Sequence, residues 1–341
     1  MNPAPDAATP GAPAGPAVTA AALAAATATE RRAAGRLTRA DRHNLRVGLL
    51  FISPWIGGFL LLCAYPLVST VYYSFCDYSV LSRPVFVGTA NYRDLFSDTL
   101  FWRAAYNTAF FALFSIPLSL LVSLTLAILL NFNLPGRGFF RTVFFLPSLV
   151  PVVCLAVLWQ WMLNGDLGLI NNAVRPVLNV LNEVLGTRLR PPNWLLEAPY
   201  AKWGVIFTGL WGVGQATVIY LAGLQDVPRH LYEAADIDGA SFWAKTRHIT
   251  LPTISPVIYF NSVMGLIGSF QVFAVPYVMT NGGDGPERAL LFLATYLFQN
   301  AFDYSNMGYA CAIGLFLFGI ILGLTYVATK LSERHVHYEG R

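Results

Sequence analysis

Six long apolar segments dominate the pattern of hydrophobic and polar positions along the chain. None of them contains Asp, Glu, Lys, Arg or His, and they run over about 47–75, 105–131, 142–163, 203–223, 254–280 and 305–329. A helix needs about 20 residues to cross the roughly 30 Å of hydrocarbon in a bilayer, and each segment is long enough. No alternation of period two indicates a β domain. The pattern therefore predicts an all-α integral membrane protein with six transmembrane helices.

Composition narrows the class of protein in the same direction. Of 341 residues, 55% are hydrophobic and 12% are charged, and the mean hydropathy is +0.53. Soluble domains carry about 25% charged residues, so a soluble fold of this size is excluded. The net charge of +4 is too small to predict binding of nucleic acid. The four cysteines are scattered and form no C-x-x-C pair, so they predict neither a disulfide scaffold nor a metal site.

The ends of the chain and the charge of the loops predict the orientation. Residues 1–29 are rich in Ala and Pro and are expected to form a disordered tail, and six arginines follow between 31 and 46. A cleaved signal peptide would need its basic residues before the apolar run, which is the reverse of this order. Lys and Arg number 14 in the N-terminal segment and the loops on its side, against 8 in the other loops. Both termini are therefore predicted to be cytoplasmic, with a tail at 1–46, a six-helix domain at 47–330 and a short tail at 331–341.

The residues needed for several kinds of chemistry are missing. The three lysines are Lys202, Lys245 and Lys330, none follows Gly, and there is no P-loop for ATP. Uncharged spans argue strongly against proton coupling, and less strongly against sodium coupling, because sodium sites can be built from carbonyls and hydroxyls. His335 and His337 form a possible metal pair, although solvated residues of a tail are the simpler interpretation. No internal repeat is evident, which favours a subunit of a larger assembly that takes its energy from another subunit.

The loop at 224–253, between spans four and five, carries local signals of structure. Asp226 is expected to cap a helix with Pro228 in its first turn, and Gly239 suits the left-handed position that ends a helix. Ser241 is then expected to cap a second short helix, and Pro252 to mark the bend into span five. These signals predict a helix–turn–helix elbow that faces the cytosol.

The elbow is predicted to present small and acidic side chains. The small residues are Ala234, Ala235, Gly239 and Ala240, and the carboxylates are Glu233, Asp236 and Asp238. Small residues allow the backbone of another protein to approach, and carboxylates at the rim can pair with basic partner residues. A solvated loop whose acids offset nearby arginines fits the same pattern, so the pattern alone leaves both interpretations open.

A resemblance to a known family favours docking. The order Glu233-Ala-Ala235, Asp238-Gly-Ala240 and Ile249-x-Leu251-Pro252 resembles the cytoplasmic coupling loop of permease subunits in binding-protein-dependent ABC importers. The likeness covers roughly 47–330 and is similar to the carbohydrate-uptake subfamily of the maltose and glycerol-phosphate type. Further matching stretches are Ala64-Tyr-Pro66, Asn91-Tyr92, Asn107-Thr108, Gly168-Leu-Ile-Asn171, Asn193-Trp194 and Thr280-Asn-Gly-Gly283. Asp284 and Gly285 interrupt the usual G-G-P of this outer loop, and the short C-terminus looks like that of the first of two permeases.

The resemblance implies a complete importer. It implies a non-catalytic permease subunit in the cell membrane that has no cofactor of its own, because ATP is bound by partner subunits. Its partners would be a second homologous permease, two cytosolic ATPase subunits, an extracytoplasmic solute-binding protein and membrane lipid. Coupling to the ATPase is expected from Glu233, Ala234, Ala235, Asp238 and Gly239. The solute would be a sugar or sugar-like compound, and disaccharide, oligosaccharide, polyol and glycerol phosphate all fit.

Polar residues within spans four and five are candidates for the solute path. On span five, at about 100° per residue, Ser269 shares one half of the helix with other polar and small residues, and Gln271 lies at its edge. Gln215, Thr217 and Tyr220 on span four are similar candidates. Neutral hydrogen-bonding groups suit a sugar, but small and hydroxyl residues also mark helix packing in membranes. An ion-driven secondary sugar carrier and a membrane-embedded enzyme or scaffold are the competing functions, and neither has its own signature in the sequence.

Overall fold

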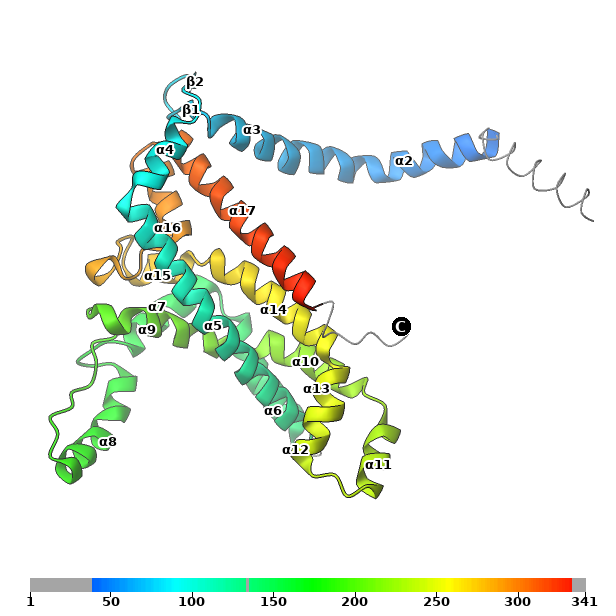
Figure 1. Cartoon of the computed structure of the whole chain (residues 1–341), viewed down its shortest axis with the longest axis vertical. Helices are drawn as coiled ribbons and strands as arrows, with labels where there is room; N and C mark the ends of the chain where they lie inside the picture. Colours follow the sequence, from blue (N-terminus) through cyan, green and yellow to red (C-terminus); the bar gives the residue numbers. More distant parts are fainter. Residues whose placement is uncertain (1–38, 133–134, 333–341) are drawn as a thin grey trace, which may run out of the picture. The chain divides into compact units, whose positions relative to one another are not determined.

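The computed structural model describes residues 39–132 and 135–332, and this part of the chain is mostly helical (Figure 1). The labels η mark π- or 3₁₀-helical stretches. In chain order the helices are α2 (Arg39–Phe59), η1 (Leu60–Ala64), α3 (Tyr65–Tyr73), α4 (Ala90–Ser97), α5 (Thr99–Asn131), α6 (Arg137–Phe145), η2 (Leu146–Leu149), α7 (Val152–Met162), α8 (Leu169–Leu185), α9 (Ala198–Trp211), α10 (Gly214–Gln225), α11 (Arg229–Ile237), α12 (Phe242–Lys245), η3 (Thr246–Thr250), α13 (Leu251–Thr253), α14 (Ser255–Phe270), α15 (Ala274–Met279), η4 (Pro286–Arg288), α16 (Leu293–Phe298), η5 (Gln299–Asp303) and α17 (Met307–Ser332). The predicted Ala- and Pro-rich tail, His335 and His337 lie outside the described residues.

The described residues also contain one short β-ladder. Strands β1 (Cys76–Asp77) and β2 (Val85–Phe86) pair antiparallel, with Cys76 opposite Phe86. The sequence predicts no strands, and this ladder is a small exception to the predicted all-α fold. Strands of two residues are too short to show an alternating pattern.

The chain divides into two compact units, residues 1–68 and 69–341. The described part of the first unit is a continuous apolar helix from α2 into α3. Its large side chains are exposed, with Phe51 at 79% and Leu62 at 71%. A helix that is apolar on its outside suits a lipid environment or contact with a partner.

Four helical segments among the described residues are long and apolar enough to cross a membrane without a sharp bend: Arg42–Tyr73, Thr99–Asn131, Ser255–Met279 and Met307–Ser332. Two further candidates are bent pairs of helices. In the first pair, α6 and η2 form one arm and α7 the other, with a bend of 98° between them; in the second pair, α9 and α10 are bent by 48°. The structure thus supports four to six spans. The segments predicted as continuous helices at 142–163 and 203–223 are broken.

Prolines explain the sharper of the two breaks. Pro147 lies in the first turn of η2, and Pro151 precedes α7. Val150 stands before Pro151 and is extended, with ψ 128°. The residue before a proline is pushed out of the helical region, and proline itself lacks the amide hydrogen that would continue the helix.

The second break packs against the first. Gly212 ends α9 and Gly214 begins α10. A Cβ atom on Gly214 would lie 2.3 Å from the carbonyl oxygen of Phe144 and 2.9 Å from the Cα of Phe145. The end of α6 and the start of α10 therefore touch backbone to backbone, at a position that only glycine can occupy.

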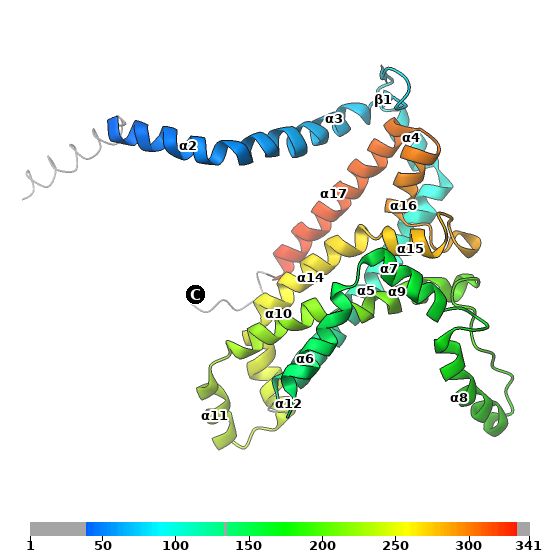
Figure 2. The same ribbon diagram turned by 180° about the vertical axis from the view of Figure 1, so that it is seen from behind.

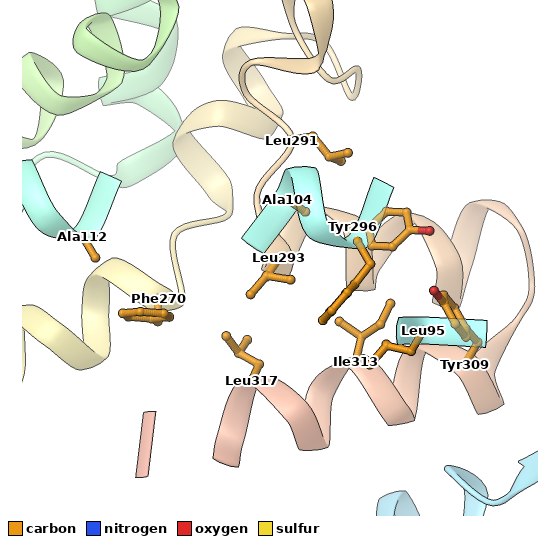
Figure 3. Packing of buried hydrophobic residues seen from close by; sticks show 11 residues of the cluster. Leu95, Ala104, Ala112, Phe270, Leu291, Leu293, Tyr296, Tyr309, Ile313 and Leu317 are labelled. Carbon is orange, nitrogen blue, oxygen red and sulfur yellow. The ribbon is translucent and has the colours of Figure 1, made fainter. Parts of the chain in front are cut away.

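Helix α5 is the central helix of the second unit, because it contributes to all three hydrophobic clusters (Figures 1 and 2). The first cluster joins its N-terminal part to α14, α16 and α17 through Phe101, Ala104, Phe270, Tyr296 and Ile313, among others (Figure 3). The second joins Phe111 to α7 and α9. The third joins Ala127 and Leu130 to α10 and to the start of α14.

Three buried asparagines hold loops in place with their side-chain amides. Each Nδ2 donates to two backbone carbonyls at 2.9 Å: Asn91 to Ser74 and Cys76, Asn107 to Arg288 and Leu291, and Asn171 to Gly165 and Pro192. Thr108 adds a bond by accepting from the amide of Leu293 at 2.9 Å. All of these asparagines and Thr108 lie in the motifs that resemble the importer family, and here they fix loop shape.

Asp98 links the first turn of α5 to α16 and α17. Its carboxylate caps α5 by accepting from the amide of Leu100 at 2.8 Å, and it also accepts from the hydroxyls of Tyr296 and Tyr309. Figure 3 shows both tyrosines at one end of the first cluster. Burial acts to raise the pKa of Asp98, but the two tyrosine hydroxyls and the backbone amides outweigh it and lower the pKa below 3.8. Burial and the Asp98 carboxylate raise the pKa of Tyr296 to about 12.

Candidate functional site

Two short helices, α11 and α12, form the loop between α10 and α14. Ser241 caps α12 as the sequence predicts, by accepting from the amide of Ala244 at 3.3 Å. Asp226 does not cap α11, because α10 continues to Gln225 and holds Asp226 in helical geometry at its own end. Pro228 takes the N-cap position of α11 instead, with φ −61° and ψ 127°.

The turn between the two helices depends on the backbone of Gly239. Its φ is +70°, and the Gly239 amide donates to the carbonyl of Asp236 at 3.1 Å while Ala240 donates to Ala235 at 2.9 Å. This pair of bonds is a Schellman ending, which needs a left-handed residue at this position. No atom lies within 4 Å of the position of a Cβ on Gly239, so the requirement for glycine is conformational rather than steric.

We use the name elbow for residues 229–245, which are attached to the core at two points. The hydroxyls of Tyr232 and Thr250 hydrogen-bond at 2.9 Å, and Tyr232 packs on the third hydrophobic cluster. The ring of Phe242 lies 5.8 Å from the ring of Phe132, the residue that directly follows α5. The elbow is thereby joined both to the central helix and to the start of α14.

The residues of the elbow that the sequence predicts for coupling are mostly accessible. Glu233, Ala234, Asp238 and Gly239 are exposed and Ala235 is half-buried. Asp236 forms an ion pair with Lys245 within the elbow.

The most exposed large side chains of the elbow are Ile237, at 88%, and Trp243, at 77%, so its outer surface is more apolar than the sequence predicts. Sequence reasoning passed over Ile237, although an isoleucine between two aspartates, Asp236 and Asp238, is a visible signal. Exposed apolar groups rimmed by charge are typical of a protein-binding surface.

A mostly apolar groove of about 230 Å³ lies between α5, α9 and α14, and three serines are the polar side chains in its lining. Ser269 lines it from α14 and Ser115 and Ser119 line it from α5. Ser269 is buried, and its hydroxyl donates to the carbonyl of Leu266 at 2.9 Å. Sequence reasoning missed the two serines of α5, although their spacing of four places them on one face of a helix.

The remaining candidates of the solute path lie outside this groove. Gln271 is exposed at the end of α14, and Gln215 is exposed at the start of α10. Thr217 is buried and donates to the carbonyl of Val213 at 3.0 Å. Tyr220 is buried in the third cluster, and its hydroxyl has no hydrogen-bond partner among the described residues. Their part in solute transport stays a prediction.

Gly265 and Gly268 also line the groove. A Cβ on Gly268 would meet no atom within 4 Å, and one on Gly265 would come no closer than 3.8 Å to Ile116. Close helix packing within the described chain therefore does not require either glycine.

A second, larger cavity of about 550 Å³ lies where the end of α7 meets the segments around 193–196 and 279–286. Its polar lining is mostly neutral, with the amides of Gln160, Asn164, Asn193 and Asn281. The amide of Gln160 also donates to the carbonyl of Met279 at 3.2 Å. Neutral amides in a concave site suit an uncharged polyhydroxyl compound.

Candidate metal ligands do not gather in the part of the chain that the structure describes. Within 39–132 and 135–332, no three of His, Cys, Asp and Glu lie close enough to hold an ion. The four cysteines are free thiols, and Cys76 is the buried one.

Comparison with known proteins agrees with this architecture. The sequence model of the family described as "Binding-protein-dependent transport system inner membrane component" matches residues 101–337. The probable ABC transporter permease protein YesP of Bacillus subtilis is 33% identical, over 89% of this chain and 96% of its own length. The trehalose/maltose transport system permease protein MalF of Thermococcus litoralis is 32% identical, over 85% of this chain and 95% of its own.

Solved structures share the fold. The bacterial alginate ABC transporter, crystallised in complex with an alginate pentasaccharide-bound periplasmic protein, contains a chain that superposes with a TM-score of 0.74 at 22% identity. The match covers 88% of this chain and 98% of that chain. The chain therefore belongs to the family of inner membrane components of binding-protein-dependent transport systems, the permease proteins of ABC transporters.

Proposed function

We propose that this permease carries a sugar or sugar-like solute into the cytoplasm, as one of two homologous permeases of an ABC importer. The relatives support a carbohydrate, since three of them are named for the transport of trehalose and maltose, of arabinooligosaccharides and of lactose. The two cavities support it too, because hydroxyls and amides predominate among their polar lining groups. A neutral sugar gains hydrogen bonds from such groups without the cost of burying a charge.

In this proposal the chain crosses the membrane six times, and each bent pair of helices counts as one crossing. Both termini and the elbow then lie in the cytoplasm. The excess of Lys and Arg on that side, 14 against 8, supports this orientation. An extracytoplasmic binding protein would deliver the solute to the opposite side, next to the cavity lined by Gln160 and Asn193.

The energy would come from two cytosolic ATPase subunits, because this chain has no P-loop and no catalytic role or cofactor of its own in the proposal. The observation that carries the proposal is the elbow, which exposes Ile237 and Trp243 while Tyr232 and Phe242 join it to α14 and α5. Glu233, Ala234, Ala235, Asp238 and Gly239 would form the contact with the ATPase.

Closure of the ATPase pair would then move the elbow. Because the elbow is joined to α5 and to the start of α14, the movement would reach the groove that those helices line with Ser115, Ser119 and Ser269. The pathway would alternate between inward and outward access, which is a switch between two packed arrangements rather than a continuous deformation.

The test compares two substitutions of one residue. Gly239→Arg puts a bulky side chain at a left-handed position, whereas Gly239→Asn keeps a residue that tolerates this conformation. The tagged chain is purified from membranes of cells that express the whole transporter, and the ATPase subunit is identified by its P-loop peptide. We expect Gly239→Asn to retain the ATPase and Gly239→Arg to lose it at normal membrane levels. Full retention by Gly239→Arg, with normal transport, would refute docking at the elbow.

A further inference from the structure

Three arginines line a cavity of about 550 Å³ beside the elbow. Arg137 and Arg141 come from α6 and Arg229 from the first turn of α11, while the ends of α5 and α10 close the remaining sides. No Asp or Glu is among its lining residues. Positive charge in a concave site attracts anions.

Arg141 lacks the partners that a buried guanidinium normally has. Its Nε and one Nη atom are buried without a hydrogen-bond partner among the described residues. Neither Arg141 nor Arg229 forms an ion pair within the described ranges. A guanidinium that is buried without compensation is costly, and an anion in the adjoining cavity would offset that cost. Planar guanidinium groups suit the oxygens of a phosphate.

The cavity lies at the level where the uncharged spans end. Helix α5 ends at Asn131, α10 ends at Gln225, and α6 begins at Arg137. Continuing along α6, Phe140 and Phe144 are exposed at 44% and 39%. They follow Arg137 and Arg141 by three residues, so basic and apolar side chains are neighbours on the helix surface. This combination matches a phosphate with a hydrocarbon chain beside it.

We propose that this cavity binds the phosphate of an anionic phospholipid headgroup, with an acyl chain along α6. Basic pockets between membrane helices on the cytoplasmic side are known to take such headgroups. The bound lipid would tie α6 to α11 and steady the elbow against the ends of α5 and α10. Placement in the cytoplasmic leaflet rests on the proposed function, whereas the binding itself does not.

Lipid binding can be measured on the full chain purified in detergent, without partners or ATP. Native mass spectrometry would follow titrations with phosphatidylglycerol, phosphatidylcholine and inorganic phosphate. The variants are Arg141→Gln and Arg229→Gln, and the control is Arg83→Gln, which removes the same charge from an exposed loop. Arg229 is exposed, so its variant is expected to fold even if Arg141→Gln does not.

We expect phosphatidylglycerol to bind more tightly than phosphatidylcholine. Each cavity variant should weaken phosphatidylglycerol binding roughly fivefold, the factor for about one charge at a membrane surface, and Arg83→Gln should leave it unchanged. Equal binding of the two lipids, or equal losses in the control, would overturn the site. Binding of inorganic phosphate that depends on the same arginines would overturn the lipid as its source. Loss of the ATPase subunit from Arg229→Gln, with unaltered lipid binding, would assign the cavity to an acidic partner protein and overturn the proposal.

Since the lipid assay needs no ATPase, its outcome is separate from that of the proposed function. An importer whose Gly239 variants behave as expected, but whose arginines do not affect lipid binding, would keep the function and lose this site. The reverse pair of results would keep the site and remove the elbow as the docking surface.

Discussion

Replacing Gly214 with alanine should push the start of α10 away from the end of α6, where the two broken helices touch. The added Cβ would lie 2.3 Å from the carbonyl oxygen of Phe144, whereas real Cβ atoms essentially never come within 3.0 Å of such a non-bonded heavy atom. The backbones of α6 and α10 must therefore move apart by at least 0.7 Å, because the atoms on the Phe144 side are main-chain atoms. Overpacking of this kind costs about 1–3 kcal/mol.

The matched control is Gly212→Ala, two residues away. Its Cβ would lie 3.5 Å from the nearest atom, the carbonyl oxygen of Gly209, which is an ordinary contact. Thermal unfolding of the two purified variants in the same detergent should lower the midpoint of Gly214→Ala by several degrees and leave Gly212→Ala close to the parent chain. Uptake by the assembled transporter should fall in the same order, because Gly209 and Leu210, just before this break, line the groove and α10, just after it, leads to the elbow.

Equal midpoints for the two variants would refute the reasoning, since they would show that α6 and α10 do not touch at Gly214. A stable Gly214→Ala chain with normal uptake would refute it as well. In either case the two broken helices would have to be treated as independent of each other.

Three further predictions concern other parts of the molecule. Asn107→Ala removes two bonds to carbonyls and should cost roughly 2–4 kcal/mol, seen as faster hydrogen exchange over residues 288–293; unchanged exchange would contradict the asparagine clamp. The pKa of Asp98 is lowered below 3.8, so its contribution to stability is present above that pH and is lost as the pH falls through the lowered value. Asp98→Asn should therefore flatten the acid side of the profile of stability against pH, and an unaltered profile would contradict this. Ser269→Ala should raise the KM for uptake about fivefold, as expected for one hydrogen bond of roughly 1 kcal/mol, and an unchanged KM would remove Ser269 from the solute path.

The existence of apolar spans could be predicted from the sequence, because uncharged runs of this length have few alternatives. Their internal geometry could not. Pro147 and Pro151 were visible in the third segment, but prolines also occur within continuous membrane helices, as Pro117 does within α5. Whether such a residue breaks a helix depends on its packing, and the contact of Gly214 with Phe144 involves residues that are 70 positions apart.

The sequence predicts the local backbone geometry of the elbow better than it predicts the elbow's surface. Gly239 and Ser241 act through neighbouring backbone groups, so their roles follow from a few adjacent residues. The anchors Tyr232 and Phe242 depend on distant partners, and pattern reasoning did not find them. The arginine cavity could not be predicted from the sequence for the same reason, since α6 and α11 come together only in the folded chain.

The central claim is that this permease moves solute only with energy received through the elbow, and uptake into proteoliposomes tests it most directly. A radiolabelled sugar that whole cells accumulate would be offered to vesicles with the purified chain alone, with the complete transporter and ATP, and with the complete transporter that carries Gly239→Arg. The account predicts accumulation only for the complete unmodified transporter with ATP. Accumulation against a gradient by the chain alone, driven by a sodium or proton gradient, would contradict it.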